Sequence, residues 1–148
     1  YPLAGYSKKI KSVNELQEGA VVAVPNDPSN LARALILLEK QGLIKLKDAT
    51  NLFSTSMDIV ENPKHLQVKE VDTSVAARAL DDVDLAVVNA QDQGVFVEEK
   101  DCPYVNIIVA RTDNKDSKAV QDFVKAYQTP EVEQEAKKHF KDGVVKGW

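Results

Sequence analysis

One arginine in an otherwise apolar stretch is the first candidate for chemistry in this sequence. Residues 31–38 read LARALILL, and Arg33 is the only polar side chain among them. The preceding residues 25–30 are dense in proline, asparagine and aspartate, so we expect a turn there and a helix over about 30–41. Arg33 would then lie near the positive end of the helix dipole and beside unpaired backbone N–H groups, where an anion is favoured.

Arg33 therefore needs an anion from outside its own helix. Its neighbours one turn further along, Ile36 and Leu37, are apolar and offer no counter-charge. One hypothesis is that Arg33 binds the carboxylate of a small ligand at this helix end. A salt bridge to an acid on another element would satisfy the guanidinium as well, and the sequence alone leaves both open.

Asparagines at the ends of expected strands are the second group of candidates: Asn26, Asn30, Asn89 and Asn106. An amide both donates and accepts hydrogen bonds, as the recognition of a zwitterionic amino acid requires. Asn106 lies inside the apolar run 104–110, where an unpartnered buried amide would cost about 1–3 kcal/mol. It contacts either a ligand or a neighbouring loop.

The elements that must position these side chains alternate along the chain. We expect strands over 1–7, 20–24, 66–71, 85–88, 95–97 and 104–110, and helices over 30–41, 56–61, 75–80, 117–127 and 130–140. Such alternation is typical of an α/β domain with a mostly parallel sheet. Ligands of these sheets bind at the carboxyl ends of the strands, which is where Asn30, Arg33 and Asn89 fall.

Catalytic and nucleic-acid-binding patterns are missing from the sequence. The two histidines, His65 and His139, lack metal-ligand spacing, no glycine-rich phosphate loop is present, and Cys102 is the only cysteine. The net charge is −4 over 148 residues, with acids and bases interspersed and without a basic stripe. We therefore expect no enzyme, no metal, no cofactor and no nucleic-acid partner.

Several stretches resemble a known family along nearly the whole chain. AVPNDPSNLARALILLEKQGLIKLKD, VENPKHLQVKEVD, ALDDVDLAVVN, CPYVNIIVARTDNKD and the closing GVVKGW are similar to the NlpA-type methionine-binding lipoproteins. These are substrate-binding components of a bacterial ABC transporter. The resemblance implies a type II periplasmic binding protein fold with two lobes. Residues 1–8 would form a hinge or first-lobe strand, 9–89 the second lobe, and 90–148 the return to the first lobe with its C-terminal helices.

The resemblance also implies roles for the candidate residues. Arg33 matches the family's carboxylate-binding arginine, and Asn30 lies at the same helix entrance. Asn106 matches the asparagine that helps to hold the amino-acid backbone. Asn89 matches the asparagine that ends the AVVN strand, or another on the far side of a short family segment that this sequence lacks.

The implied partners are methionine, a transporter permease with its ATPase, and the membrane through an N-terminal lipid anchor that this chain does not carry. The implied location is the periplasmic side of the bacterial cell envelope. Alternatives are a sensor domain of the same fold, or a binding protein for another small amino acid or a dipeptide. The family's long N-terminal portion, which forms most of the first lobe, is also missing. We therefore expect the 148-residue chain alone to bind methionine weakly or not at all.

Overall fold

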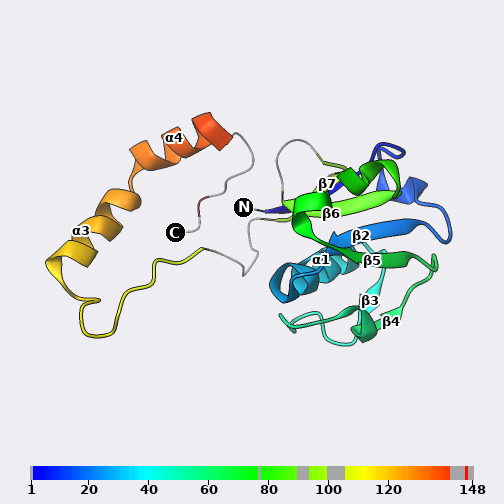
Figure 1. The fold of residues 1–148 in the computed structure, drawn as a ribbon, viewed down its shortest axis with the longest axis horizontal. Helices are drawn as coiled ribbons and strands as arrows, with labels where there is room; N and C mark the ends of the chain where they lie inside the picture. The colour runs from blue at the N-terminus through cyan, green and yellow to red at the C-terminus, as the bar shows by residue number, and fades with distance from the viewer. Residues whose placement is uncertain (1, 77, 90–93, 100–105, 141–145, 147–148) are drawn as a thin grey trace.

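The computed structural model describes residues 2–76, 78–89, 94–99, 106–140 and 146, and its centre is a five-stranded sheet (Figure 1). The strand order is β5-β2-β6-β1-β7, with bounds β1 Leu3–Tyr6, β2 Val21–Pro25, β5 Gln67–Val71, β6 Leu85–Asn89 and β7 Phe96–Val97. β2 runs parallel to β5 and β6, whereas β1 runs antiparallel to β6 and β7. All strands of this sheet except β1 therefore point the same way, which confirms the predicted α/β class.

Helix α1, Pro28–Lys40, covers one face of the sheet and fills the larger core. Its buried side chains include four leucines, and burying each contributes about 1.5–3 kcal/mol. The helix begins at Pro28 with Asp27 as its N-cap, two residues before the predicted start, and Gly42 follows its end with a φ of 70°. Only glycine adopts that backbone conformation without strain.

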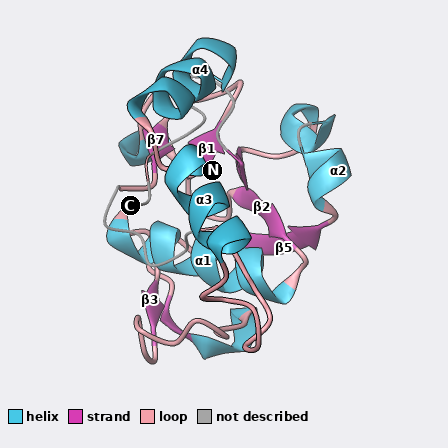
Figure 2. Ribbon diagram, turned by 90° about the vertical axis from the view of Figure 1, so that its left-hand side faces the viewer, coloured by secondary structure: helices cyan, strands magenta, loops and turns pink. Residues whose placement is uncertain are grey.

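Shorter helices cover the opposite face, and Figure 2 shows α2 and α1 on opposite sides of the strands. α2, Thr73–Ala76, and the 3-10 helix η3, Arg78–Asp81, occupy the place of the helix predicted over 75–80. The small core beneath them consists of Ala23, Val83 and Ala86 with partly buried neighbours. The described part of this body therefore has helices on both faces of one sheet, as doubly wound α/β folds do.

A two-stranded sheet pairs β3, Lys45–Leu46, with β4, Ile59–Glu61. The helix predicted over 56–61 is wrong, because only a single 3-10 turn, η2 Ser56–Asp58, precedes β4. The Asp58 carboxylate accepts the backbone N–H of Thr55 at 2.8 Å and so closes that turn. The β-branched residues that follow favour the extended strand.

The segment 106–140 is set apart from the sheet in Figure 1. It contains α3, Lys118–Tyr127, and α4, Pro130–Phe140, with Ser117 as the predicted N-cap of α3. The predicted strand over 104–110 is wrong for its described part, because residues 106–110 pair with no strand among the described residues. Ile107 and Val109 are 74% and 80% exposed. An apolar run becomes a strand only where a neighbour takes up its backbone hydrogen bonds.

The helices of this segment likewise bury none of their residues. Phe123 and Tyr127 stack on each other on the apolar face of α3, with ring centroids 6.2 Å apart, and both remain about half exposed. An open groove of about 390 Å³ runs between residues 107–110 and α3. Both helices form where the sequence predicts them, and what they lack among the described residues is a surface to pack on.

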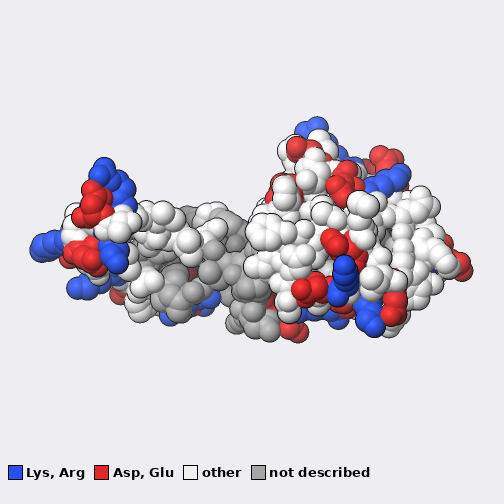
Figure 3. All heavy atoms as spheres, turned by 90° about the horizontal axis from the view of Figure 1, so that it is seen from below, with Lys and Arg blue, Asp and Glu red and all other residues white. Residues whose placement is uncertain are grey.

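The charged surface is mixed in sign. On the face drawn in Figure 3, lysines and arginines alternate with acids, and neither sign forms a continuous stripe. None of the helices in the described parts of the chain is long and apolar enough to cross a bilayer.

Candidate functional site

The expected site lies where β2 ends and α1 begins, and an acid of the chain already occupies this helix end. The Asp27 carboxylate accepts the backbone N–H of Asn30 at 2.9 Å and its side-chain amide at 3.1 Å. Asp27 therefore already places a negative charge at the helix end where the sequence predicts a ligand anion. The helix starts early enough for Asp27 to supply the negative charge itself.

Arg33 lies in the second turn of α1, beyond the first turn in which the helix dipole acts strongly. The helix dipole therefore does not require an external anion beside Arg33. Arg33 instead forms a two-pronged ion pair with Glu98, which follows β7. Nε of Arg33 donates to Oε1 of Glu98 at 2.9 Å and to Oε2 at 3.0 Å, and Nη2 donates to Oε2 at 2.6 Å. The two side chains are only 11% and 7% exposed.

This geometry realises the second alternative that the sequence left open, a salt bridge to an acid on another element. The counter-ion of Arg33 thus comes from within the chain. A ligand role for Arg33 stays a prediction. A ligand would have to bind Arg33 while Glu98 remains paired with it.

The backbone of β1 binds both the side chain and the backbone of Glu98. The Leu3 backbone N–H donates to Oε2 of Glu98 at 2.8 Å, and the Glu98 backbone N–H donates to the Leu3 carbonyl at the same distance. Lys40, two turns beyond Arg33 on α1, adds a looser exposed pair with Glu99 at 3.6 Å. Helix α1 is therefore tied to the residues that leave β7, with the strong contact at Glu98.

The asparagines divide into those that lie at this edge and one that does not. Oδ1 of Asn30 lies 3.5 Å from Nη1 of Arg33, so these two predicted residues meet. Asn89 ends β6 and lies opposite Leu3 in the strand register, one strand from the backbone that holds Glu98. Asn106 is exposed in the segment 106–110, which pairs with no strand among the described residues. In the described part of the chain, no hydrogen bond joins Asn106 to Asn30, Arg33 or Asn89. Exposure also removes the desolvation cost expected for its amide.

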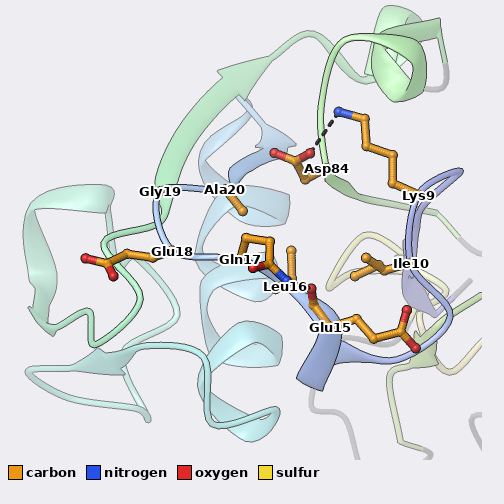
Figure 4. Close-up of a pocket in the computed structure, with 9 residues that line it drawn as sticks. All are labelled: Lys9, Ile10, Glu15, Leu16, Gln17, Glu18, Gly19, Ala20 and Asp84. Atoms are coloured by element: carbon orange, nitrogen blue, oxygen red, sulfur yellow. Dashed lines mark hydrogen bonds and ion pairs between the residues drawn. The ribbon is translucent and has the colours of Figure 1, made fainter.

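A hollow of about 590 Å³ lies at the other end of the sheet, where β2 begins (Figure 4). Lys9 donates to Asp84 at 2.8 Å on one side of it, and the Glu18 side chain points away from the others. Two hydrogen bonds lower the pKa of Asp84 below its ordinary 3.8. The bond from Lys9 has the larger effect, and the bond from the backbone N–H of Val21 adds to it. Because ligands of α/β sheets bind at the carboxyl ends of strands, we assign no site to this hollow.

Catalytic constellations are not apparent in the described parts of the chain. His65 and His139 are both exposed and pair with glutamates at 3.0 and 3.2 Å. The described ranges hold no cluster of three or more histidines, cysteines or acids that could bind a metal ion. Cys102 lies outside the described residues.

Glu98 is the residue that the sequence reasoning missed. It stands in the run Glu98-Glu99-Lys100, which reads as an ordinary charged loop. One available signal is its position directly after the strand predicted over 95–97, because Arg33 was also predicted to lie at the carboxyl ends of the strands.

Comparisons with known proteins agree on one family. The model of the NlpA lipoprotein family matches residues 1–148. A Haemophilus influenzae protein described as "Probable D-methionine-binding lipoprotein MetQ" is 78% identical, with 100% of this chain and 58% of that protein covered.

Two solved structures show the same fold. An ABC transporter periplasmic substrate-binding protein from Coxiella burnetii has a TM-score of 0.88 and 41% identity, covering 99% of this chain and 66% of that one. A nutrient-binding protein from Burkholderia cenocepacia bound to methionine has a TM-score of 0.89 and 44% identity, again covering 99% and 66%.

The chain is shorter than these relatives in two respects. It spans less than two thirds of each of them. The alignment with the Haemophilus protein also extends over 158 positions for a chain of 148 residues, so that relative carries ten further residues within the aligned region. This agrees with the short segment that the sequence was predicted to lack.

Proposed function

Because the chain belongs to the NlpA lipoprotein family, we propose that it binds methionine at the periplasmic side of the bacterial cell envelope and delivers it to an ABC importer. The observation that carries the proposal is the similarity, over 99% of the chain, to a nutrient-binding protein bound to methionine. The ABC transporter protein from Coxiella burnetii supports the transport role. A membrane permease with its ATPase would be the partner, and a lipid anchor would hold the whole protein at the membrane.

The chemistry at the end of β2 and β6 suits an amino acid. The Arg33 guanidinium would bind the ligand carboxylate on the side of Nη1, which faces Asn30. Glu98 would remain bound to Nε and Nη2 on the other side of the guanidinium. Amides at Asn30 and Asn89 can donate to the carboxylate or accept from the ammonium group. Arginine suits this task because its planar donors match a carboxylate in two-pronged fashion.

The same proposal assigns the parts of the chain to two lobes. Residues 9–89 would form the second lobe together with β1 and β7, which pair into the same five-stranded sheet, and residues 106–140 would belong to the first lobe. The exposed apolar residues of 107–110 and of α3 would pack on first-lobe residues of the full-length protein. Hinge closure would then bring Asn106 towards Arg33, and the thioether would lie against the added lobe.

A comparison of two proteins tests this proposal. The first is the 148-residue chain, and the second is a full-length form in which the chain is joined to the parts of the Haemophilus relative that it does not match. Calorimetric titration with both enantiomers of methionine should give saturable binding to the full-length form and weak or no binding to the chain alone. Equal affinity of the two proteins would show that the chain carries the whole site and would refute the two-lobe proposal.

A further inference from the structure

We propose that Glu98 is a positioning residue of the amino-acid site, which orients the Arg33 guanidinium and cancels its charge so that the site selects a zwitterion over a simple anion. The inference rests on the proposed function, because it takes Arg33 as the group that binds the ligand carboxylate. It adds a residue outside the predicted ligand set and a reason for the choice of ligand.

The orientation follows from how Glu98 itself is held. Its carboxylate accepts from Nε and Nη2 of Arg33 and from the Leu3 backbone N–H, while its own backbone N–H donates to Leu3. The carboxylate is thus attached to the sheet through β1 and does not depend on a flexible loop. Because a guanidinium is planar, fixing its Nε–Nη2 edge also fixes the direction of Nη1, which faces Asn30.

Burial strengthens the effect of these charges on a ligand. Both side chains are almost completely buried, so their charges act on a ligand with little solvent screening. The Arg33–Glu98 pair carries no net charge, and neither does a zwitterionic amino acid. An anion without an ammonium group would add one uncompensated negative charge to this site. With Glu98 neutralised, the positive charge of Arg33 would no longer be balanced within this pair, and the site would discriminate less against that anion.

The test measures a ratio of affinities in the full-length form. The ligands are methionine and its hydroxy analogue, the anion in which a hydroxyl replaces the ammonium group. The variant Glu98→Gln keeps the size of the side chain and removes the charge. We expect the preference for methionine over the hydroxy analogue to fall by about tenfold or more, the effect of one poorly screened charge on another several Å away. Glu99→Gln, which removes an exposed acid from the next position, should leave the ratio unchanged.

A purely structural role for Glu98 would weaken both ligands equally, so an unchanged ratio overturns the inference. Tighter methionine binding by Glu98→Gln would overturn it too, because Glu98 would then be competing with the ligand carboxylate.

If thermal unfolding shows that Glu98→Gln does not fold, Glu98→Asp replaces it. This variant keeps the charge on a shorter stem, so both ligands should bind more weakly at the parent ratio, and a shifted ratio would contradict the charge argument. A parent protein that binds no methionine would refute the proposed function itself. That result differs from normal binding with an unmoved ratio, which refutes only the role of Glu98.

Discussion

Removing either partner of the Arg33–Glu98 pair should destabilise the 148-residue chain far more than removing both. In Arg33→Met, the Glu98 carboxylate stays nearly buried with the Leu3 backbone N–H as its remaining contact from this group. In Glu98→Gln, the guanidinium stays nearly buried beside a neutral amide. Each single variant therefore leaves a nearly buried charge that has lost the opposite charge of this pair.

The magnitude follows from the geometry. Breaking a buried pair by removing one partner costs about 3–5 kcal/mol, whereas replacing both charged groups leaves no orphaned charge and costs much less. We therefore expect each single variant to lose about 3 kcal/mol or more of unfolding free energy. The double variant should lose less than either single variant, so its loss should fall short of the sum of the two single losses by more than about 3 kcal/mol.

Urea denaturation followed by far-ultraviolet circular dichroism measures these free energies in a double-mutant cycle. The matched control is the Lys45–Glu61 ion pair. Its nitrogen–oxygen distance is a similar 3.0 Å, but its side chains are 60% and 61% exposed. Substitutions there should show no measurable coupling. A coupling below about 0.5 kcal/mol between Arg33 and Glu98 would be ordinary additivity and would refute the reasoning.

Three further outcomes are expected. The lowered pKa of Asp84 means that its contacts stabilise the fold above the ordinary pKa of 3.8 and that this contribution is lost as pH falls through the folded-state pKa. Asp84→Asn should therefore cost stability at neutral pH and flatten the acid limb of a pH–stability curve, and an unchanged curve would contradict this. Gly5→Ala should cost about 1–3 kcal/mol in denaturant unfolding, because the new Cβ would lie 2.3 Å from the Phe96 ring, and a neutral effect would show that the ring moves freely. Phe123→Ser should leave the melting temperature of the 148-residue chain unchanged and lower that of the full-length form, whereas equal shifts would contradict packing of α3 on the added lobe.

Local sequence signals predicted the elements around β2 and α1 well. The β-branched run, the turn residues and Gly42 each act within a few positions, so their effects can be read without the fold. The same kind of reasoning placed the start of α1 two residues late, because Asp27 was taken as part of the turn. That small error put Arg33 in the first turn and created an apparent need for an outside anion.

The partner of Arg33 could not be predicted because it lies 65 residues away in the chain. Glu98 lies beside α1 because β7 pairs with β1, so the contact depends on sheet order rather than on local pattern. The strand predicted over 104–110 is wrong for a related reason in its described part, residues 106–110. Their apolar pattern does favour a strand, but a strand also requires a neighbour, and the described parts of the chain provide none.

The most direct test of the central claim is calorimetric titration of methionine into the full-length form and its Arg33→Ala variant, with Arg111→Ala, an exposed arginine, as the control. We expect saturable binding that Arg111→Ala leaves unchanged and that Arg33→Ala weakens by at least about 1.5–3 kcal/mol, the contribution of a charged hydrogen bond. Absence of methionine binding in the full-length form, or full affinity in a folded Arg33→Ala variant, would contradict it.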